Sequence, residues 1–66
     1  MSVAKVVELT SSSTKSFEDA IASGITRAEK TLENVAGAWV SEQKVKVERG
    51  KITEWRVTMR VSFVLK

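Results

Sequence analysis

The chain has neither cysteine nor histidine among its 66 residues. Without cysteine there is no disulfide framework, and without either residue we expect no metal site built from nitrogen and sulfur ligands. The serines and threonines gather where helix capping explains them, and the acidic residues are scattered along the chain. These residues offer no nucleophile paired with a general base. The sequence therefore predicts no catalytic residues, no metal ligands and no enzyme.

Long apolar runs are also absent. Residues Met1 to Thr10 lack the apolar centre of a signal peptide, and nothing approaches the run of about 18 apolar residues that indicates a membrane span. We therefore expect a cytoplasmic protein with no membrane partner.

The chain is short enough that its core must be small. Residues 1–66 make one domain, and a chain of this size buries only about 60% of the surface that its unfolded form exposes. Because no disulfide is available, oligomerisation is the usual remaining way to stabilise such a chain. We expect self-association.

The net charge of +3 is unevenly distributed. Residues 1–43 carry four basic and six acidic side chains, whereas residues 44–66 carry seven basic and two acidic ones. A basic strand pair with a tryptophan could bind single-stranded nucleic acid, a phosphorylated cofactor or the acids of a neighbouring subunit. Residues 1–43, which include the expected helix, are acidic and argue against nucleic acid as a partner. Charge alone does not distinguish a phosphorylated cofactor from the acids of a neighbouring subunit.

The end of the chain has the pattern of a long β-hairpin. From Thr53 to Leu65, odd positions are mostly apolar and even positions mostly polar, which predicts a strand with one buried face. The stretch Ala38–Val47 is its expected partner. Arg49 and Gly50 form the expected two-residue loop, because glycine tolerates a positive φ angle.

A two-residue loop fixes which side chains share a face. Pairing Glu48 with Lys51 puts Trp39 opposite Arg60 and Gln43 opposite Arg56. Cross-strand neighbours interact directly. We therefore expect one polar face to carry an indole, away from the face of Trp55, which we interpret as a core residue. The full set predicted for that polar face is Trp39, Ser41, Gln43, Arg56, Thr58 and Arg60.

The first half of the chain predicts a strand and then a helix. Val3–Leu9 is rich in β-branched residues, and the hydroxyl-rich run Thr10–Thr14 is expected to form a turn. Ser13 or Ser16 should cap a helix that runs to about Asn34, with Ala36-Gly37 as a short link to the next strand. Apolar residues recur at three- and four-residue steps along one side of this helix. They are Phe17, Ala20, Ile21, Gly24, Ile25, Ala28, Leu32 and Val35.

The predicted fold class is α+β, with element order β-α-β-β and one helix packed across one face of a three-stranded antiparallel sheet. A single helix is about 10–12 Å wide, so it can cover only one face. Gly24, near its middle, is expected to allow close packing of helix on sheet. The opposite face, with Trp39 and Arg56, is left open, and an open face with long strand edges favours association with other subunits.

Four stretches of this chain, in this order and spacing, resemble the dodecins, small bacterial and archaeal flavin-binding proteins. The matching stretches are Lys5–Leu9, Ser16–Ile21, Arg27–Val35 and Trp55–Leu65. The resemblance covers nearly the whole chain without gaps. It implies a hollow homododecamer of cubic symmetry that binds riboflavin or FMN in pairs between aromatic side chains of symmetry-related subunits. Such proteins resemble storage, buffering or photoprotective binders rather than enzymes.

The resemblance also shows where this chain departs from the family pattern. The flavin-stacking tryptophan of the family falls on Gly37 here, whereas Trp39 lies two positions later, on the same strand face but displaced by about 6–7 Å. The glutamine that bonds the flavin ring in the family falls on Arg56. Arginine has donors but no acceptor, so it suits a flavin carbonyl or a phosphate rather than the ring N–H.

Three residues are the resulting candidates for flavin binding. Trp39 would stack on the ring, or instead pack at a subunit interface or against the cation of Arg60. Arg56 would bond a flavin carbonyl or phosphate, or instead form an interface ion pair. Gln43 has both donor and acceptor and could replace the missing glutamine, or instead bond across an interface. Because Gln43 lies four positions from Trp39, a shared site would draw on more than one protomer.

A second function class remains open. A cage of the same architecture could be structural or bind ions without an organic ligand, with Glu42 lining a channel and holding a hydrated cation.

Overall fold

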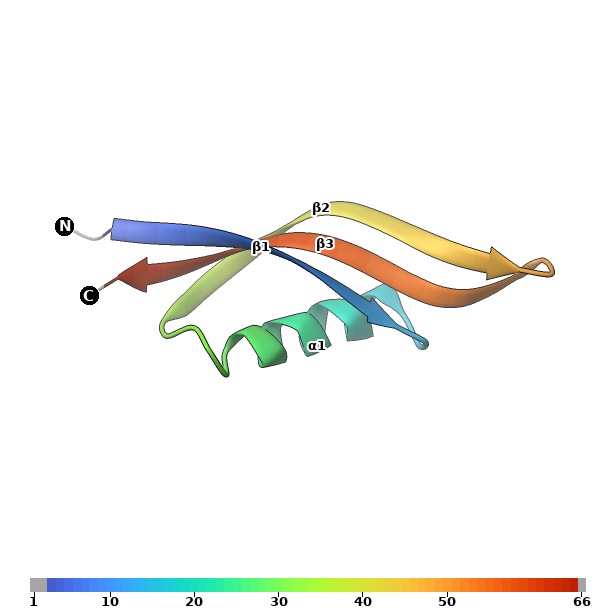
Figure 1. Ribbon diagram of the computed structural model, residues 1–66, viewed down its shortest axis with the longest axis horizontal. Helices are drawn as coiled ribbons and strands as arrows, with labels where there is room; N and C mark the ends of the chain where they lie inside the picture. Colours follow the sequence, from blue (N-terminus) through green and yellow to red (C-terminus); the bar gives the residue numbers. More distant parts are fainter. Residues whose placement is uncertain (1–2, 66) are drawn as a thin grey trace.

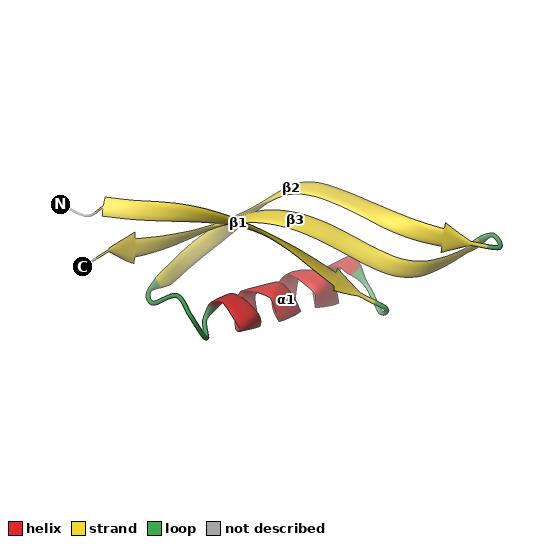
Figure 2. Ribbon diagram, viewed as in Figure 1, coloured by secondary structure: helices red, strands yellow, loops and turns green. Residues whose placement is uncertain are grey.

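The computed structural model describes residues 3–65, so the predicted domain 1–66 extends slightly beyond the described part at both ends. β1 (Val3–Ser13) is followed by α1 (Phe17–Ala28), β2 (Val35–Glu48) and β3 (Lys51–Leu65). The strands form one antiparallel sheet in the order β1-β3-β2. Figure 2 shows α1 lying along one face of this sheet. The predicted α+β fold with β-α-β-β order is confirmed.

The hairpin of β2 and β3 projects well beyond the rest of the protomer (Figure 1). Ser13, the last residue of β1, pairs with Trp55, so the part of β3 that precedes Trp55 pairs only with β2. We call residues 45–55 the arm. The protomer is consequently elongated, with extents of 52 × 19 × 13 Å.

The core is small and depends on the central strand. Val57, Met59 and Val61 of β3 are fully buried, together with Ala20 of α1. This confirms the predicted alternation for this part of β3, where the odd-numbered side chains face the helix. The partly buried residues packed around them are Val7, Leu9, Phe17, Ile21, Ile25, Leu32, Val35 and Val40. Within the described residues the helix is neither long nor apolar enough to cross a membrane.

The start of α1 is fixed by two serines. The Ser16 hydroxyl accepts a hydrogen bond from the backbone N–H of Asp19 at 3.0 Å, which makes Ser16 the N-cap. The buried Ser13 hydroxyl accepts from the N–H of Lys15 at 2.9 Å and donates to Asp19 Oδ2 at 2.6 Å. Of the two predicted caps, Ser16 is confirmed, while Ser13 supports the turn before it.

Three predicted boundaries are wrong, namely the end of the first strand, the end of the helix and the start of the second strand. Most of the hydroxyl-rich run is strand rather than turn, because Ser11 and Ser12 pair with Val57 and Arg56 of β3, whose ladder satisfies their backbone groups. The helix ends at Ala28 rather than near Asn34.

The early helix end follows from the start of β2. The chain must turn back after Ala28 because Val35 already pairs with Phe63. Asn34 completes this reversal with φ of 59°, a conformation that asparagine tolerates. The predicted link Ala36-Gly37 is therefore part of β2, and the pairing register shifts between Val35 and Gly37.

The loop of the hairpin is as predicted. Glu48 pairs with Lys51, and the two residues between them, Arg49 and Gly50, have φ of 53° and 75°. Positive φ at both positions defines the tight turn that matches the twist of two antiparallel strands.

Gly24 lies where the helix approaches the sheet most closely. A Cβ at this position would lie 2.6 Å from Met59 Cε and 3.0 Å from Ser11 Cβ. Close packing is therefore the role of this glycine, as expected from the sequence.

We expect Gly24→Ala to destabilise the protein by about 1 kcal/mol in urea unfolding. Overpacking costs about 1–3 kcal/mol, which exceeds the gain of roughly 1 kcal/mol from better helix propensity. Ser23→Ala, at the exposed neighbouring position, is the control and should not lose stability. A Gly24→Ala protein more stable than the parent would contradict the packing role.

Candidate functional site

The sheet face away from α1 carries polar side chains from all three strands. Arg56, Thr58 and Arg60 of β3 pair with Ser12, Thr10 and Glu8 of β1, respectively. These are the residues that alternate with the buried ones. We call this surface the open face, because α1 lies on the opposite side of the sheet (Figure 2).

Trp39 stands exposed on the open face. Its exposed fraction is 62%, the largest among the exposed large apolar residues. Trp39 pairs with Arg60, as predicted, and the Arg60 guanidinium carbon lies 5.2 Å from the centroid of the indole ring. Arg60 Nε is in turn 3.6 Å from Glu8 Oε2. The cation-π contact proposed as one role of Trp39 is confirmed within the protomer.

An open hollow adjoins this indole. Its volume is about 500 Å³, and it is lined by Val6, Ala38, Trp39, Arg60 and Ser62. Apolar surface, one aromatic ring and one cation converge there, which is a composition suited to a planar ligand with polar substituents.

A register shift in β2 changes which side chains join Trp39. Val40 pairs with Met59, but Glu42 pairs with Thr58, so Ser41 is an extra residue in β2. The Ser41 hydroxyl donates to the Thr58 carbonyl at 3.2 Å. A bulge of this kind turns every following side chain of its strand to the other face.

The predicted pairing of Gln43 with Arg56 is therefore wrong. Gln43 pairs with Val57 and belongs to the helix-side face, whereas Lys44 pairs with Arg56 on the open face. The structure thus brings Trp39 and Arg56 to one face and leaves Gln43 on the other.

A second shift lies in β3 near the end of the arm. Lys46 pairs with Glu54, but Val47 pairs with Ile52, so one residue of β3 is unpaired between them. Val45, Val47 and Ile52 consequently share the helix-side face of the arm with Trp55. Trp55 is half-buried there, and the other three are exposed.

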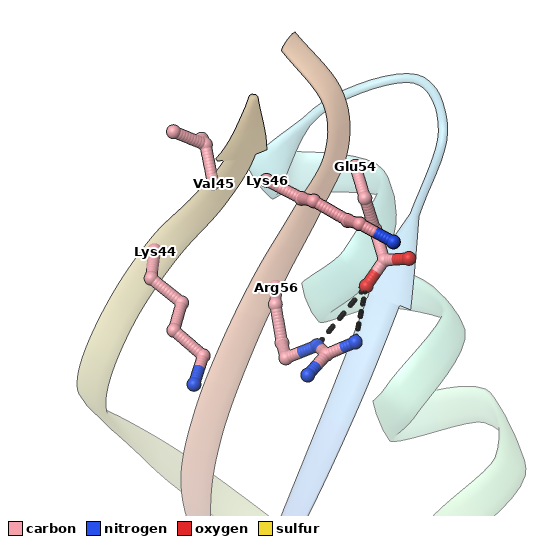
Figure 3. Close-up of a pocket in the computed structure, with 5 residues that line it drawn as sticks. All are labelled: Lys44, Val45, Lys46, Glu54 and Arg56. Carbon is pink, nitrogen blue, oxygen red and sulfur yellow. Dashed lines mark hydrogen bonds and ion pairs between the residues drawn. The ribbon is translucent and has the colours of Figure 1, made fainter. Parts of the chain in front are cut away.

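Arg56 is held by a neighbour on its own strand. Its Nε donates to Glu54 Oε1 at 3.0 Å, and its Nη2 donates to the same oxygen (Figure 3). A hollow of about 340 Å³ at this place is lined by Lys44, Val45, Lys46, Glu54 and Arg56. Lys44 and Lys46 were not among the residues predicted for a site.

Trp39 and Arg56 do not converge on one small group. Trp39 lies opposite Arg60, four residues along β3 from Arg56, and four strand residues span about 13 Å. A ligand could reach both only if it were elongated or bound between protomers, as the sequence suggested.

Among residues 3–65, no group of three or more acidic, histidine or cysteine side chains is placed to hold a metal ion. Glu42 is exposed and pairs with Thr58 on the open face.

These features define a small β-α-β-β protein with one covered and one open sheet face. Residues 3–66 match the family model described as Dodecin. The chain belongs to the dodecin family.

Similar proteins are found in several bacteria. The calcium dodecin of Mycobacterium tuberculosis is 37% identical over 67 aligned residues, which cover 100% of this chain and 93% of that protein. Its solved structure, described as calcium chelating with a novel calcium-binding site, superimposes with a TM-score of 0.82 at 34% identity, covering 97% and 91% of the two chains. The dodecin of Streptomyces davaonensis superimposes with a TM-score of 0.93 at 34% identity, covering 98% and 96%.

Proposed function

We propose that this dodecin binds a flavin, FMN or riboflavin, against Trp39 and stores or buffers it rather than transforming it. The observation that carries the proposal is the 62% exposed indole beside an open hollow. Arg60 covers one side of the ring, which leaves the other for a planar ligand. Stacking of aromatic rings adds about 0.5–1.5 kcal/mol to what burial supplies.

The assembly that we propose is a hollow homododecamer in the cytoplasm, as the family resemblance implies. The protomer supports self-association because apolar side chains lie exposed along it. Val47 and Ile52 of the arm are 57% and 47% exposed, and Val3 and Leu65 at the opposite end are 59% and 48% exposed. Because the buried core is small, the chain gains stability when other copies of it cover these exposed apolar side chains.

The roles proposed for Arg56 and Gln43 follow from their faces. Arg56, with Nε and Nη2 engaged by Glu54, still presents Nη1 to a ligand carbonyl or phosphate. Gln43 lies on the helix-side face of its own protomer, so it would reach a flavin ring only from a neighbouring subunit.

Titration of FMN and riboflavin, followed by flavin fluorescence, tests the proposal. We expect the parent to quench both flavins and Trp39→Ala to bind them at least about tenfold more weakly, a loss of roughly 1.4 kcal/mol. The control is Trp55→Phe, which changes the half-buried indole on the other face and should bind like the parent. Equal quenching by the Trp39→Ala protein and the parent would show that Trp39 does not stack on flavin.

A second candidate function is calcium binding, favoured by the 37% identity to calcium dodecin. The described residues hold no acidic cluster within one protomer, so such a site would combine oxygen ligands from several protomers with water. Glu42, on the open face, is the residue that we propose for it. Calcium binding that survives Trp39→Ala and is lost in Glu42→Gln, without flavin quenching by the parent, would favour this function.

A further inference from the structure

Gly37, near the start of β2, is a glycine that the fold itself does not require. Its φ angle is not positive, since Gly50 is the glycine with positive φ among residues 3–65. A Cβ at position 37 would meet only Ser62 Oγ, at 3.7 Å, which is an ordinary contact. The neighbouring register shift inserts Ala36, and a bulge needs glycine only where φ is positive. A glycine that serves neither turn nor bulge marks a place in a strand that another group approaches closely.

Gly37 lies on the open face beside the exposed indole. It pairs with Ser62, which pairs on its other side with Val6. Trp39 is two residues further along β2 in an unbroken register, so positions 37 and 39 share a face and lie about 6–7 Å apart. The Ser62 hydroxyl is turned toward β2, because it donates to the Gly37 carbonyl at 3.2 Å.

The hollow beside Trp39 extends toward Gly37 rather than away from it. Ser62 and Val6, which line the hollow, form one row across the sheet with Gly37, whereas the row on the other side of Trp39 contributes no residue to its lining. Val6 is apolar and 54% exposed, and the hydroxyl of Ser62 is engaged. The floor of the hollow is therefore uncharged, and it is lowest where Gly37 has no side chain. We call the space over Gly37 and beside Trp39 the ring slot.

We propose that Gly37 is the residue that determines which ligands stack on Trp39, because the ring slot admits the uncharged, apolar edge of a planar ring. Side chains of a strand stand roughly perpendicular to the sheet, so a ring stacked on the indole also stands on the sheet, toward position 37. The role of Gly37 rests on the proposed function, since the ring that enters the slot is the one stacked on Trp39. It adds the residue that limits the thickness of the ligand at this place.

The size of the slot predicts which side chains at position 37 are tolerated. Two stacked groups lie about 3.5–4.0 Å apart, so a ring between positions 37 and 39 fills nearly all of their spacing of about 6–7 Å. A single methyl group directly above the Cα of residue 37 leaves that spacing intact. A branched side chain widens along the strand and takes up the space of the ring. Alanine should therefore be accepted at position 37, and valine should not.

Titration of the assembled protein with riboflavin, followed by flavin fluorescence, tests the ring slot. Riboflavin carries no phosphate, so its binding reports on the ring and the uncharged chain. We expect Gly37→Ala to bind within about threefold of the parent and Gly37→Val at least about tenfold more weakly. Ser12→Val is the matched control, because it adds valine at an exposed position of the open face that does not line the hollow. That protein should bind like the parent.

Urea unfolding without flavin distinguishes a ligand slot from a structural glycine. Valine is favoured in strands, and it restricts the unfolded chain more than glycine does. The unfolding midpoint of Gly37→Val, at the same protein concentration, should therefore equal or exceed that of the parent. A lower midpoint would show that the fold needs this glycine and would overturn the ring slot.

Three further results would overturn the role of Gly37. Equal riboflavin binding by Gly37→Val and the parent would do so while leaving the proposed function in place. A parent that quenches no riboflavin would overturn the proposed function and the ring slot with it. A smaller assembly mass for Gly37→Val in native mass spectrometry would show that the backbone of a neighbouring subunit, and not a ligand, approaches this glycine.

Discussion

Replacing both Val47 and Ile52 with lysine is expected to break the assembly into single chains. The two residues lie opposite each other on the helix-side face of the arm and are 57% and 47% exposed in the protomer. Burying such a side chain contributes about 1.5–3 kcal/mol, and each contact is repeated in every copy of a symmetric assembly. Replacing both side chains with lysine removes that contribution and places two positive charges directly opposite each other.

Light scattering and native mass spectrometry measure this effect. The parent should have the mass of a dodecamer, and the Val47→Lys/Ile52→Lys protein the mass of one chain. Glu48→Lys is the matched control, because it adds the same positive charge at the neighbouring residue, which points to the other face. That protein should keep the parental mass. If the doubly substituted protein also kept it, the apolar face of the arm would have no part in assembly.

Much of the fold could be predicted because one strand carries a clear signal. The period of two in β3 identified its buried face, and Val57, Met59 and Val61 are the residues that are fully buried. The loop at Arg49 and Gly50 then placed Trp39 opposite Arg60, which is how the structure has it. Both predictions use alternation and turn chemistry, which act over short distances along the chain.

The register between the two shifts, from Glu42 to Lys46 of β2, could not be obtained in this way. Alternation and loop length assume an unbroken ladder, and each bulge reverses the alternation. One signal was present in the sequence. Val40 is apolar at an even position, whereas Val45 and Val47 are apolar at odd ones. If all three face the helix side, an extra residue must lie between Val40 and Val45, and Ser41 is that residue.

The error at Gln43 had the same origin. The predicted register was wrong by one residue at this point. It placed the neutral amide of Gln43 opposite Arg56, where the structure has Lys44. The prediction therefore did not place Lys44 and Lys46 on the face of Arg56, although both lysines were plain in the sequence. The pairing of Trp39 with Arg60 was predicted correctly because two register shifts lie between it and the loop, one extra residue in β3 and one in β2, and they cancel. The ligand itself depends on which groups neighbouring subunits contribute, and one sequence does not determine that.

The end of the helix shows how tertiary pairing overrides a local pattern. Leu32 and Val35 continue the apolar spacing of α1, which is why a helix to about Asn34 was expected. Both do pack against the core, but Val35 does so from β2, after the chain has turned back. A spacing of three to four residues marks a buried side chain without fixing the conformation that buries it.

Met59→Ala is expected to have the largest effect on stability of any single substitution proposed. Met59 is 0% exposed, lies in the central strand and is the largest of the fully buried side chains. Truncating a buried methionine to alanine costs about 2–5 kcal/mol. A domain of this length has a total stability of only about 3–10 kcal/mol, so the change removes a large part of it. Neighbouring residues cannot fill the space easily, because the core holds few other side chains.

The measurement is urea unfolding followed by circular dichroism at one fixed protein concentration, since assembly adds to apparent stability. Met59→Leu, which nearly conserves volume, is the control and should cost less than about 1.5 kcal/mol. Leucine also lacks the terminal Cε that crowds position 24, so Gly24→Ala should cost less in the Met59→Leu protein than in the parent. A Met59→Ala protein with parental stability would mean that contacts between subunits, rather than the core beneath α1, hold the protomer folded.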